Sequence, residues 1–206
     1  KDNFDNDGFK FSTAKYITIE DVKIWAQRLS YVGELGYELY VDLRDTKKIY
    51  ELLIEKGKDF NLSNCGMHAM DIMRMESGFL HWGHDISPEE NQYQAGLSFT
   101  ISNKKEVDFI GKQALEKIKQ DKVKTRFSMF TLKESEPGKP LLLHDEPIYD
   151  GEKIIGRSTS GNYSFNFKKN LVFGYINNDL SNEELQNKNL FIEVEKKKYP
   201  ISIQSE

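Results

Sequence analysis

Apolar and polar positions alternate in the first part of the chain and predict a small β-sheet. Residues 14–19 and 22–29 alternate with a period of two, as a strand with one buried face does. Residues 37–43 repeat this pattern, and Gly33 and Gly36 predict a tight bend directly before them. The region therefore predicts three short strands.

Apolar spacings of three and four residues then predict helices. The first is expected to begin at a cap formed by Asp45 or Thr46 and to end at Gly57. The second spans about 66–77, and because it is apolar on several sides we expect it to be largely buried. A strand near 94–101 and a short helix near 109–120 complete this first part of the chain.

Beyond residues 121–124 the period changes to two and turn signals become frequent. Short strands separated by Asp-Gly, Gly-Asn and Asn-Asn turns are typical of a small barrel or sandwich. The fold class predicted is α+β, with a first domain over 1–122 and a β domain over 123–206. The strands expected in the second domain lie at 126–132, 153–156, 171–176, 190–194 and 199–203.

Composition narrows the function classes. The chain has 206 residues, 30% of them charged, and a net charge of −4, so no overall positive field attracts nucleic acid. Cys65 is the only cysteine, which excludes an internal disulfide. Because no apolar run is long enough to span a bilayer and the first residues do not form a signal peptide, we expect no membrane partner and a cytoplasmic location.

The stretch from Arg28 to Val41 is the most informative for chemistry, because it places Tyr31, Glu34 and Glu38 beside a half-buried strand. Carboxylates near a buried strand are costly unless a partner accepts them, and a carboxylate can receive two parallel N–H donors. Spacing alone favours the simpler alternative, a hairpin whose glutamates stay in solvent.

Other polar residues have both structural and functional interpretations. Arg74 lies on an apolar helix, where it pairs with Asp71 three residues earlier or contacts a ligand. The His-x-x-His-Asp string around Trp82 lacks a third ligand at a standard spacing, so we expect no metal site. Trp82 either stacks on a ligand or packs in the core, and Arg157 lies in a hydroxyl-rich string that turn formation also explains.

Several strings together resemble, in the same order along the chain, the folate-binding aminomethyltransferase family, which includes the glycine cleavage T-protein. The similarity covers about residues 9–203 and is greatest to the folate domains of dimethylglycine and sarcosine dehydrogenases. The strings are Arg28–Val41, Cys65–Gly78, His81–Ile86, Gln94–Leu97, Asp108–Leu115, Glu146–Tyr149 and Gly156–Gly161.

The resemblance implies the C-terminal part of the folate-binding domain, followed by a small antiparallel β-barrel. Members of the family begin earlier and carry there an aspartate assigned to the chemical step, which no segment here matches. No Gly-x-Gly-x-x-Gly string is present, so FAD is expected only if an oxidase domain lies upstream. We therefore expect the C-terminal portion of a larger enzyme, or a truncated relative. The missing half would leave open strand edges that favour self-association.

For the site, the resemblance implies that Glu38, or else Glu34, accepts two hydrogen bonds from the pterin of tetrahydrofolate and that Tyr31 lines the ring. Arg74, Trp82 and Arg157 are further candidate folate contacts, and no catalytic residue is assigned. The expected function is to help pass a carbon unit from an N-methyl amine, dimethylglycine or sarcosine, to give 5,10-methylenetetrahydrofolate. The alternatives are a glycine cleavage T-protein or folate-dependent demethylase, and a noncatalytic folate-binding or assembly module.

Overall fold

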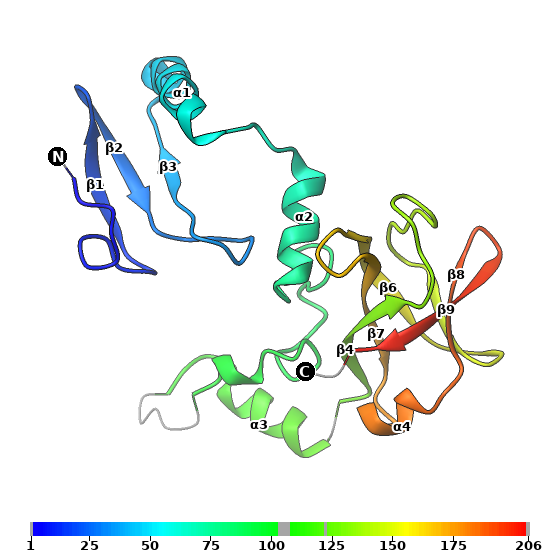
Figure 1. Ribbon diagram of the computed structural model, residues 1–206. Helices are drawn as coiled ribbons and strands as arrows, with labels where there is room; N and C mark the ends of the chain where they lie inside the picture. The colour runs from blue at the N-terminus through cyan, green and yellow to red at the C-terminus, as the bar shows by residue number, and fades with distance from the viewer. Residues whose placement is uncertain (1, 103–107, 122, 205–206) are drawn as a thin grey trace. The chain divides into compact units, whose positions relative to one another are not determined.

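The computed structural model describes residues 2–102, 108–121 and 123–204, which divide into two compact units, Lys1–Phe79 and Leu80–Glu206 (Figure 1). The presence of helices beside antiparallel strands confirms the predicted α+β class. The division between the compact units falls between Phe79 and Leu80. The domain boundary expected near residue 122 stays a prediction.

The first unit contains an antiparallel three-stranded sheet in the order β1-β2-β3. Its strands are β1 (Ala14–Ile19), β2 (Val22–Gln27) and β3 (Glu38–Tyr40). Inward side chains such as Ile17 and Ile24 pack with Ile49 of α1 (Leu43–Gly57) in one hydrophobic cluster. One face of the sheet is thereby buried, and the predicted alternation is confirmed.

Helix α1 begins earlier than expected. Its N-cap is Asp42, whose carboxylate accepts the backbone N–H of Arg44 at 3.0 Å, so the prediction of Asp45 or Thr46 was wrong. A short 3-10 helix, η1 (Lys58–Phe60), follows α1.

Helix α2 (Met67–Glu76) is buried only in its C-terminal half, through Ile72, Arg74 and Met75. Met67 in the first turn is 68% exposed, so the expectation of a largely buried helix was wrong for that turn. Ser77 is the C-cap of the helix, and Gly78 follows it with φ +73°, the left-handed conformation that ends many helices.

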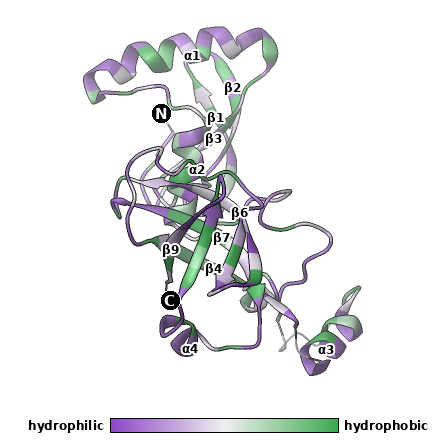
Figure 2. Cartoon of the chain, turned by 90° about the vertical axis from the view of Figure 1, so that its right-hand side faces the viewer, coloured by the Kyte–Doolittle hydropathy of each residue, from purple (hydrophilic) through white to green (hydrophobic). Residues whose placement is uncertain are grey.

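The second unit contains a closed barrel of six antiparallel strands in the order β4-β7-β6-β5-β8-β9, which confirms the predicted barrel. Its interior holds apolar side chains from every strand, and Figure 2 shows hydrophobic colouring on β4 and β7. The strands are β4 (Thr125–Leu132), β5 (Pro147–Asp150), β6 (Lys153–Ser164), β7 (Lys169–Asn177), β8 (Leu190–Val194) and β9 (Lys197–Ile203).

Short helices complete this unit: η2 (Ser98–Thr100), α3 (Lys112–Asp121) and α4 (Asn182–Gln186). The strand expected near 94–101 was wrong. The Asn91 side chain accepts the backbone N–H groups of Tyr93 and Gln94 at 3.0 and 3.1 Å, and Gly96 has φ +72°. This local side-chain bonding competes with strand formation and favours turns.

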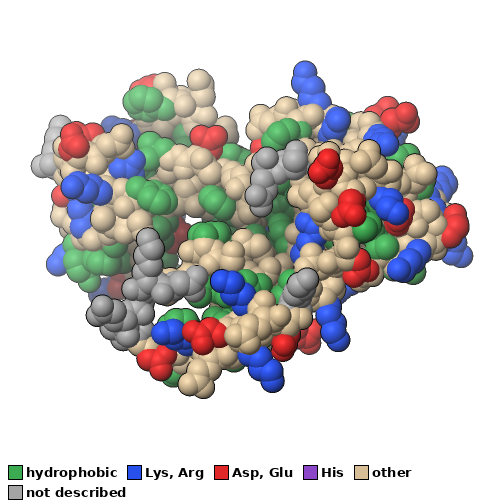
Figure 3. Space-filling view, turned by 90° about the horizontal axis from the view of Figure 1, so that it is seen from below, with side chains coloured by type: hydrophobic (Ala, Val, Ile, Leu, Met, Phe, Trp, Pro, Cys, Tyr) green, Lys and Arg blue, Asp and Glu red, His purple; other side chains and the backbone are tan. Residues whose placement is uncertain are grey.

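The surface carries both signs of charge. Figure 3 shows lysine and arginine side chains interspersed with aspartate and glutamate on the face it presents. Among the described residues, the helices are all too short or too polar to cross a membrane.

Candidate functional site

The sequence Tyr31-Val32-Gly33 forms a loop that rests on the C-terminal end of α2. The Ser77 hydroxyl lies 3.2 Å from the carbonyl oxygen of Val32 and 3.0 Å from that of Met73. Gly33 has φ +73°, and a Cβ at this position would lie 2.0 Å from the Ser77 oxygen. Only glycine therefore fits the loop to the helix here.

Tyr31 lies in this loop and is half-buried. Its ring stacks on that of Phe79, with centroids 6.2 Å apart and an interplanar angle of 14°. The structure thus gives Tyr31 a packing partner within its own unit, and the predicted contact with a ligand ring stays a prediction.

Arg74 is 1% exposed and is held by groups close to it in the sequence. Its guanidinium donates to Asp71 Oδ1 at 2.9 and 2.7 Å and to the carbonyl oxygen of Phe79 at 3.1 Å. A buried charge needs such partners, so this geometry supports the structural interpretation in which Arg74 closes the end of α2. A direct ligand contact by Arg74 stays a prediction.

The two candidate glutamates differ in their surroundings. Glu34 is exposed in the bend, whereas Glu38 is the first residue of β3 and projects from the face of the sheet opposite the core. The Tyr40 hydroxyl donates to Glu38 Oε2 at 2.8 Å. The pKa of Tyr40 is raised by this hydrogen bond and by the negative charge of Glu38.

Three aromatic side chains lie in register across this same outer face. Tyr16 is opposite Trp25 and Trp25 is opposite Tyr40, and we call these three residues the aromatic row. The rings of Tyr16 and Trp25 have centroids 4.9 Å apart, and Tyr16 and Tyr40 are 60% and 55% exposed. The Glu38 carboxylate thus lies beside an accessible aromatic surface, a combination that suits a flat ring with N–H donors at its edge.

In the second unit, the loop that carries Trp82 is tied to the barrel by a buried aspartate. Asp85 is 1% exposed and accepts hydrogen bonds from the hydroxyls of Thr159 and Ser160 on β6 at 2.5 and 2.8 Å. It also accepts the backbone N–H of His81 at 2.8 Å, and its own carbonyl accepts the Tyr175 hydroxyl at 2.9 Å. Burial raises the pKa of Tyr175 above its ordinary value.

Trp82 and Arg157 are both exposed. Trp82 is 66% exposed, which favours availability to a ligand over core packing. Arg157, also on β6, forms an ion pair with Asp145, and hydrogen bonds from His144 and Arg157 lower the pKa of the Asp145 carboxyl. Through Asp85, the Trp82 loop is held against the strand that carries Arg157.

Histidines cluster at this loop, since the rings of His81 and His84 lie 4.6 Å apart and those of His84 and His144 lie 6.5 Å apart. In the described ranges, however, no group of three or more His, Cys, Asp or Glu residues has the geometry to hold a metal ion.

Sequence reasoning missed Tyr40, the aromatic row and the anchoring role of Asp85. Tyr40 follows Glu38 by two positions on a strand, so the period of two already placed both on one face. The hydroxyl-rich string Ser158–Ser160 was the available signal for a buried acceptor, but its pairing with Asp85 joins segments more than seventy residues apart.

The chain thus combines an α+β unit with a unit that contains a closed antiparallel barrel. A family model described as "GCVT N-terminal domain" matches residues 1–105, and one described as "Glycine cleavage T-protein C-terminal barrel domain" matches residues 126–206. The chain belongs to this glycine cleavage T-protein family.

Individual relatives agree with this assignment. Dimethylglycine dehydrogenase of Rattus norvegicus is 35% identical over 98% of this chain and 23% of its own length. Sarcosine dehydrogenase of Homo sapiens is 32% identical over 83% of this chain and 18% of its own length. Aminomethyltransferase of Symbiobacterium thermophilum is 34% identical over 81% of this chain and 44% of its own length. This chain therefore spans less than half the length of each of these relatives.

A solved structure supports the fold. Glycine cleavage system aminomethyltransferase T from Bartonella henselae superposes with a TM-score of 0.74 at 22% identity, over 88% of this chain and 48% of that chain. At this identity the likeness extends to the fold alone.

Proposed function

We propose that this chain is part of a tetrahydrofolate-dependent one-carbon enzyme. In this proposal, the complete protein acts on an N-methyl amine, dimethylglycine or sarcosine, and yields 5,10-methylenetetrahydrofolate. Membership of the glycine cleavage T-protein family and the similarity to dimethylglycine dehydrogenase support it.

The observation that carries the proposal is the position of Glu38 on the outer face of the sheet. Its carboxylate is accessible, its Oε2 is held by Tyr40, and the aromatic row lies on the same face. A pterin has two adjacent N–H donors at its edge and a flat ring, so the residues present fit it. The exposed Glu34, in a bend and off the strand, offers no such combination.

In this function the residues of the chain bind and orient. Tetrahydrofolate would supply the nucleophilic nitrogens that accept the carbon unit. Glu38 would fix the edge of the ring and the aromatic row would fix its plane, which holds the acceptor in place for a reaction completed by groups outside this chain. No catalytic residue is assigned here, and FAD would enter only through an oxidase domain elsewhere in a longer protein.

A second candidate is an aminomethyltransferase of the T-protein type. The 34% identity to the Symbiobacterium protein favours this candidate. That match covers 81% of the chain, however, whereas the match to dimethylglycine dehydrogenase covers 98%, which favours the dehydrogenase type. The two candidates share the folate site, so binding alone does not separate them. Activity of the complete protein toward dimethylglycine would separate the two candidates.

The proposal is tested by titrating the full chain with tetrahydrofolate while following tryptophan fluorescence, since Trp25 lies in the aromatic row. We expect saturable quenching. The absence of saturable quenching up to about 1 mM tetrahydrofolate, which corresponds to a binding free energy of only about −4 kcal/mol, would contradict folate binding by this chain.

Tyr40 is expected to support binding by orienting the Glu38 carboxylate. Tyr40→Phe removes the hydroxyl that donates to Glu38 and keeps the ring, so we expect the Kd for tetrahydrofolate to rise about threefold, the size of one net hydrogen bond. Tyr16→Phe is the matched control, because Tyr16 is 60% exposed on the same face, and the Kd of this variant should stay unchanged. Equal effects of the two variants would argue against an orienting role.

A further inference from the structure

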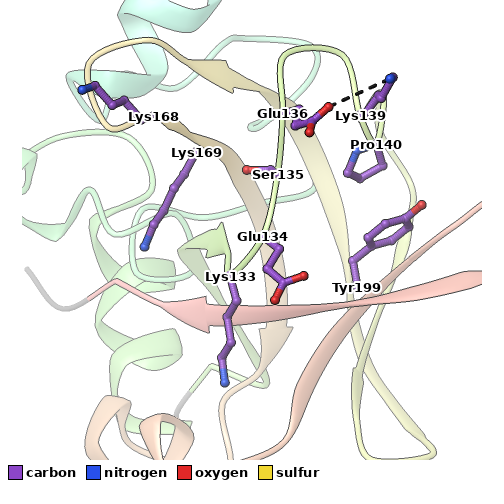
Figure 4. Close-up of a pocket in the computed structure, with 9 residues that line it drawn as sticks. All are labelled: Lys133, Glu134, Ser135, Glu136, Lys139, Pro140, Lys168, Lys169 and Tyr199. Carbon is purple, nitrogen blue, oxygen red and sulfur yellow. Dashed lines mark ion pairs between the residues drawn. The ribbon is translucent and has the colours of Figure 1, made fainter.

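The barrel has a surface pocket of about 590 Å³ that is separate from the residues discussed above. Its walls come from the loop after β4 and from the start of β7, with Tyr199 of β9 on one side (Figure 4). The volume falls in the range of about 300–1,000 Å³ typical of small-molecule sites.

The wall of the pocket is fixed by a buried side chain. Asn170 is 1% exposed; its backbone N–H donates to Ser135 Oγ at 2.9 Å and its side-chain amide to the carbonyl oxygen of Pro140 at 3.3 Å. Glu136 and Lys139 exchange two backbone hydrogen bonds of 3.0 and 2.9 Å, which close the tip of the loop. The pocket is therefore formed before any ligand arrives.

The charge of the pocket is opposite to that of the whole chain. Four lysines and two glutamates line it, whereas the chain carries a net charge of −4. Lys139 forms a loose ion pair with Glu136, in which Lys139 Nζ and Glu136 Oε2 are 3.9 Å apart. Lys133, Lys168 and Lys169 form no ion pair within the described parts of the chain, so the pocket holds an excess of positive charge.

These charges are not spread evenly. Figure 4 shows Lys133, Lys168 and Lys169 on one side, and Pro140 and the Tyr199 ring on the other, with the Glu134 carboxylate between the two sides. A ligand that matches this arrangement has negative groups at one end and a flat, partly apolar body at the other. In such a complex, Glu134 would accept N–H donors of that body and would repel negative groups from the Tyr199 side.

We propose that this pocket binds a ligand of the nucleoside phosphate type, with a flat heteroaromatic ring that has N–H donors and two or more negative charges. The ring lies between Pro140 and Tyr199, and the phosphates contact the three lysines. Lysine is a common phosphate ligand as a flexible point charge, and an aromatic face stacks on heteroaromatic rings. The proposal is independent of folate binding by the first unit.

The test is calorimetric titration of the full chain with ADP, pyrophosphate, adenosine and benzene-1,3,5-tricarboxylate at low salt. We expect ADP to bind more tightly than any of the other three, because it alone combines ring and phosphates. Lys168→Ala/Lys169→Ala should weaken ADP binding about fivefold, since two phosphate contacts are lost. The control Lys153→Ala/Lys197→Ala removes two exposed lysines of the same barrel outside the pocket and should leave the Kd within twofold.

A Glu134→Ala variant separates ring recognition from simple charge attraction. Pyrophosphate binding should strengthen because a negative charge is removed, while the preference for ADP over pyrophosphate should narrow. The proposal is overturned if ADP binding is absent at about 1 mM, if pyrophosphate or the tricarboxylate binds as tightly as ADP, or if the control variant weakens ADP as much as the pocket variant. All four lysines in these variants are exposed, so the folded barrel is expected to persist.

Discussion

Replacing Glu38 by alanine is expected to raise the Kd for tetrahydrofolate by more than tenfold. The carboxylate would accept two parallel N–H donors from the pterin edge, and charge-assisted hydrogen bonds are about twice as strong as neutral ones. Without it, the ring donors lose their acceptors on binding, a cost above the ~1.4 kcal/mol that a tenfold change represents. The measurement is the same fluorescence titration as for the unchanged chain.

Glu34→Ala provides the matched control, because it removes the same side chain four residues earlier from an exposed position in the bend. We expect its Kd to change by less than twofold. An unchanged Kd for Glu38→Ala together with weakened binding by Glu34→Ala would transfer the role to Glu34. If neither substitution alters a measurable Kd, the carboxylate recognition that carries the proposed function is wrong.

The strands could be predicted because their signal is local. One buried face imposes a period of two, and each of the five strands expected in the barrel overlaps an observed one. Strand β5 was missed because it spans only Pro147–Asp150, and Pro147 at its first position obscures a strand pattern. The start of the first helix was placed three or four residues late because Asp42 and Asp45 are equally good caps, and only the observed backbone decides between them.

Some features of the candidate site could likewise be predicted from local spacing, and others could not. The position of Glu38 on a strand, and the presence of Tyr40 on the same face, follow from spacing within one segment. The aromatic row does not, because it depends on the register that sets Tyr16 opposite Trp25 and Trp25 opposite Tyr40. Register arises from pairing between segments and is invisible in any one of them.

The contacts of Asp85 are the clearest case of a long-range relation that local patterns do not reveal. In the sequence it ends a His-x-x-His-Asp string for which we expected no metal site and no specific role, whereas in the structure its carboxylate accepts hydrogen bonds from two hydroxyls of β6 and a backbone N–H. Asp85→Ala removes the acceptor of all three donors, of which the hydroxyls belong to the buried residues Thr159 and Ser160 and the N–H to the half-buried His81. Each orphaned donor costs about 1–3 kcal/mol, and because hydroxyls rotate to other acceptors, we expect a total loss of about 3 kcal/mol in the free energy of unfolding.

Urea unfolding of the full chain, followed by near-ultraviolet circular dichroism, measures this loss as a lower midpoint with an unchanged m value. Asp85→Asn keeps one acceptor oxygen for the hydroxyls but turns an amide toward other donors, so an intermediate loss is expected. Asp145→Asn is the control: it removes the charge of an aspartate whose side chain is 56% exposed in its ion pair with Arg157, and asparagine suits the left-handed backbone at this position, φ +65°. Exposed pairs contribute less than about 1 kcal/mol. If Asp85→Ala is no more destabilising than Asp145→Asn, the loop that carries Trp82 is held to the barrel by contacts other than this carboxylate.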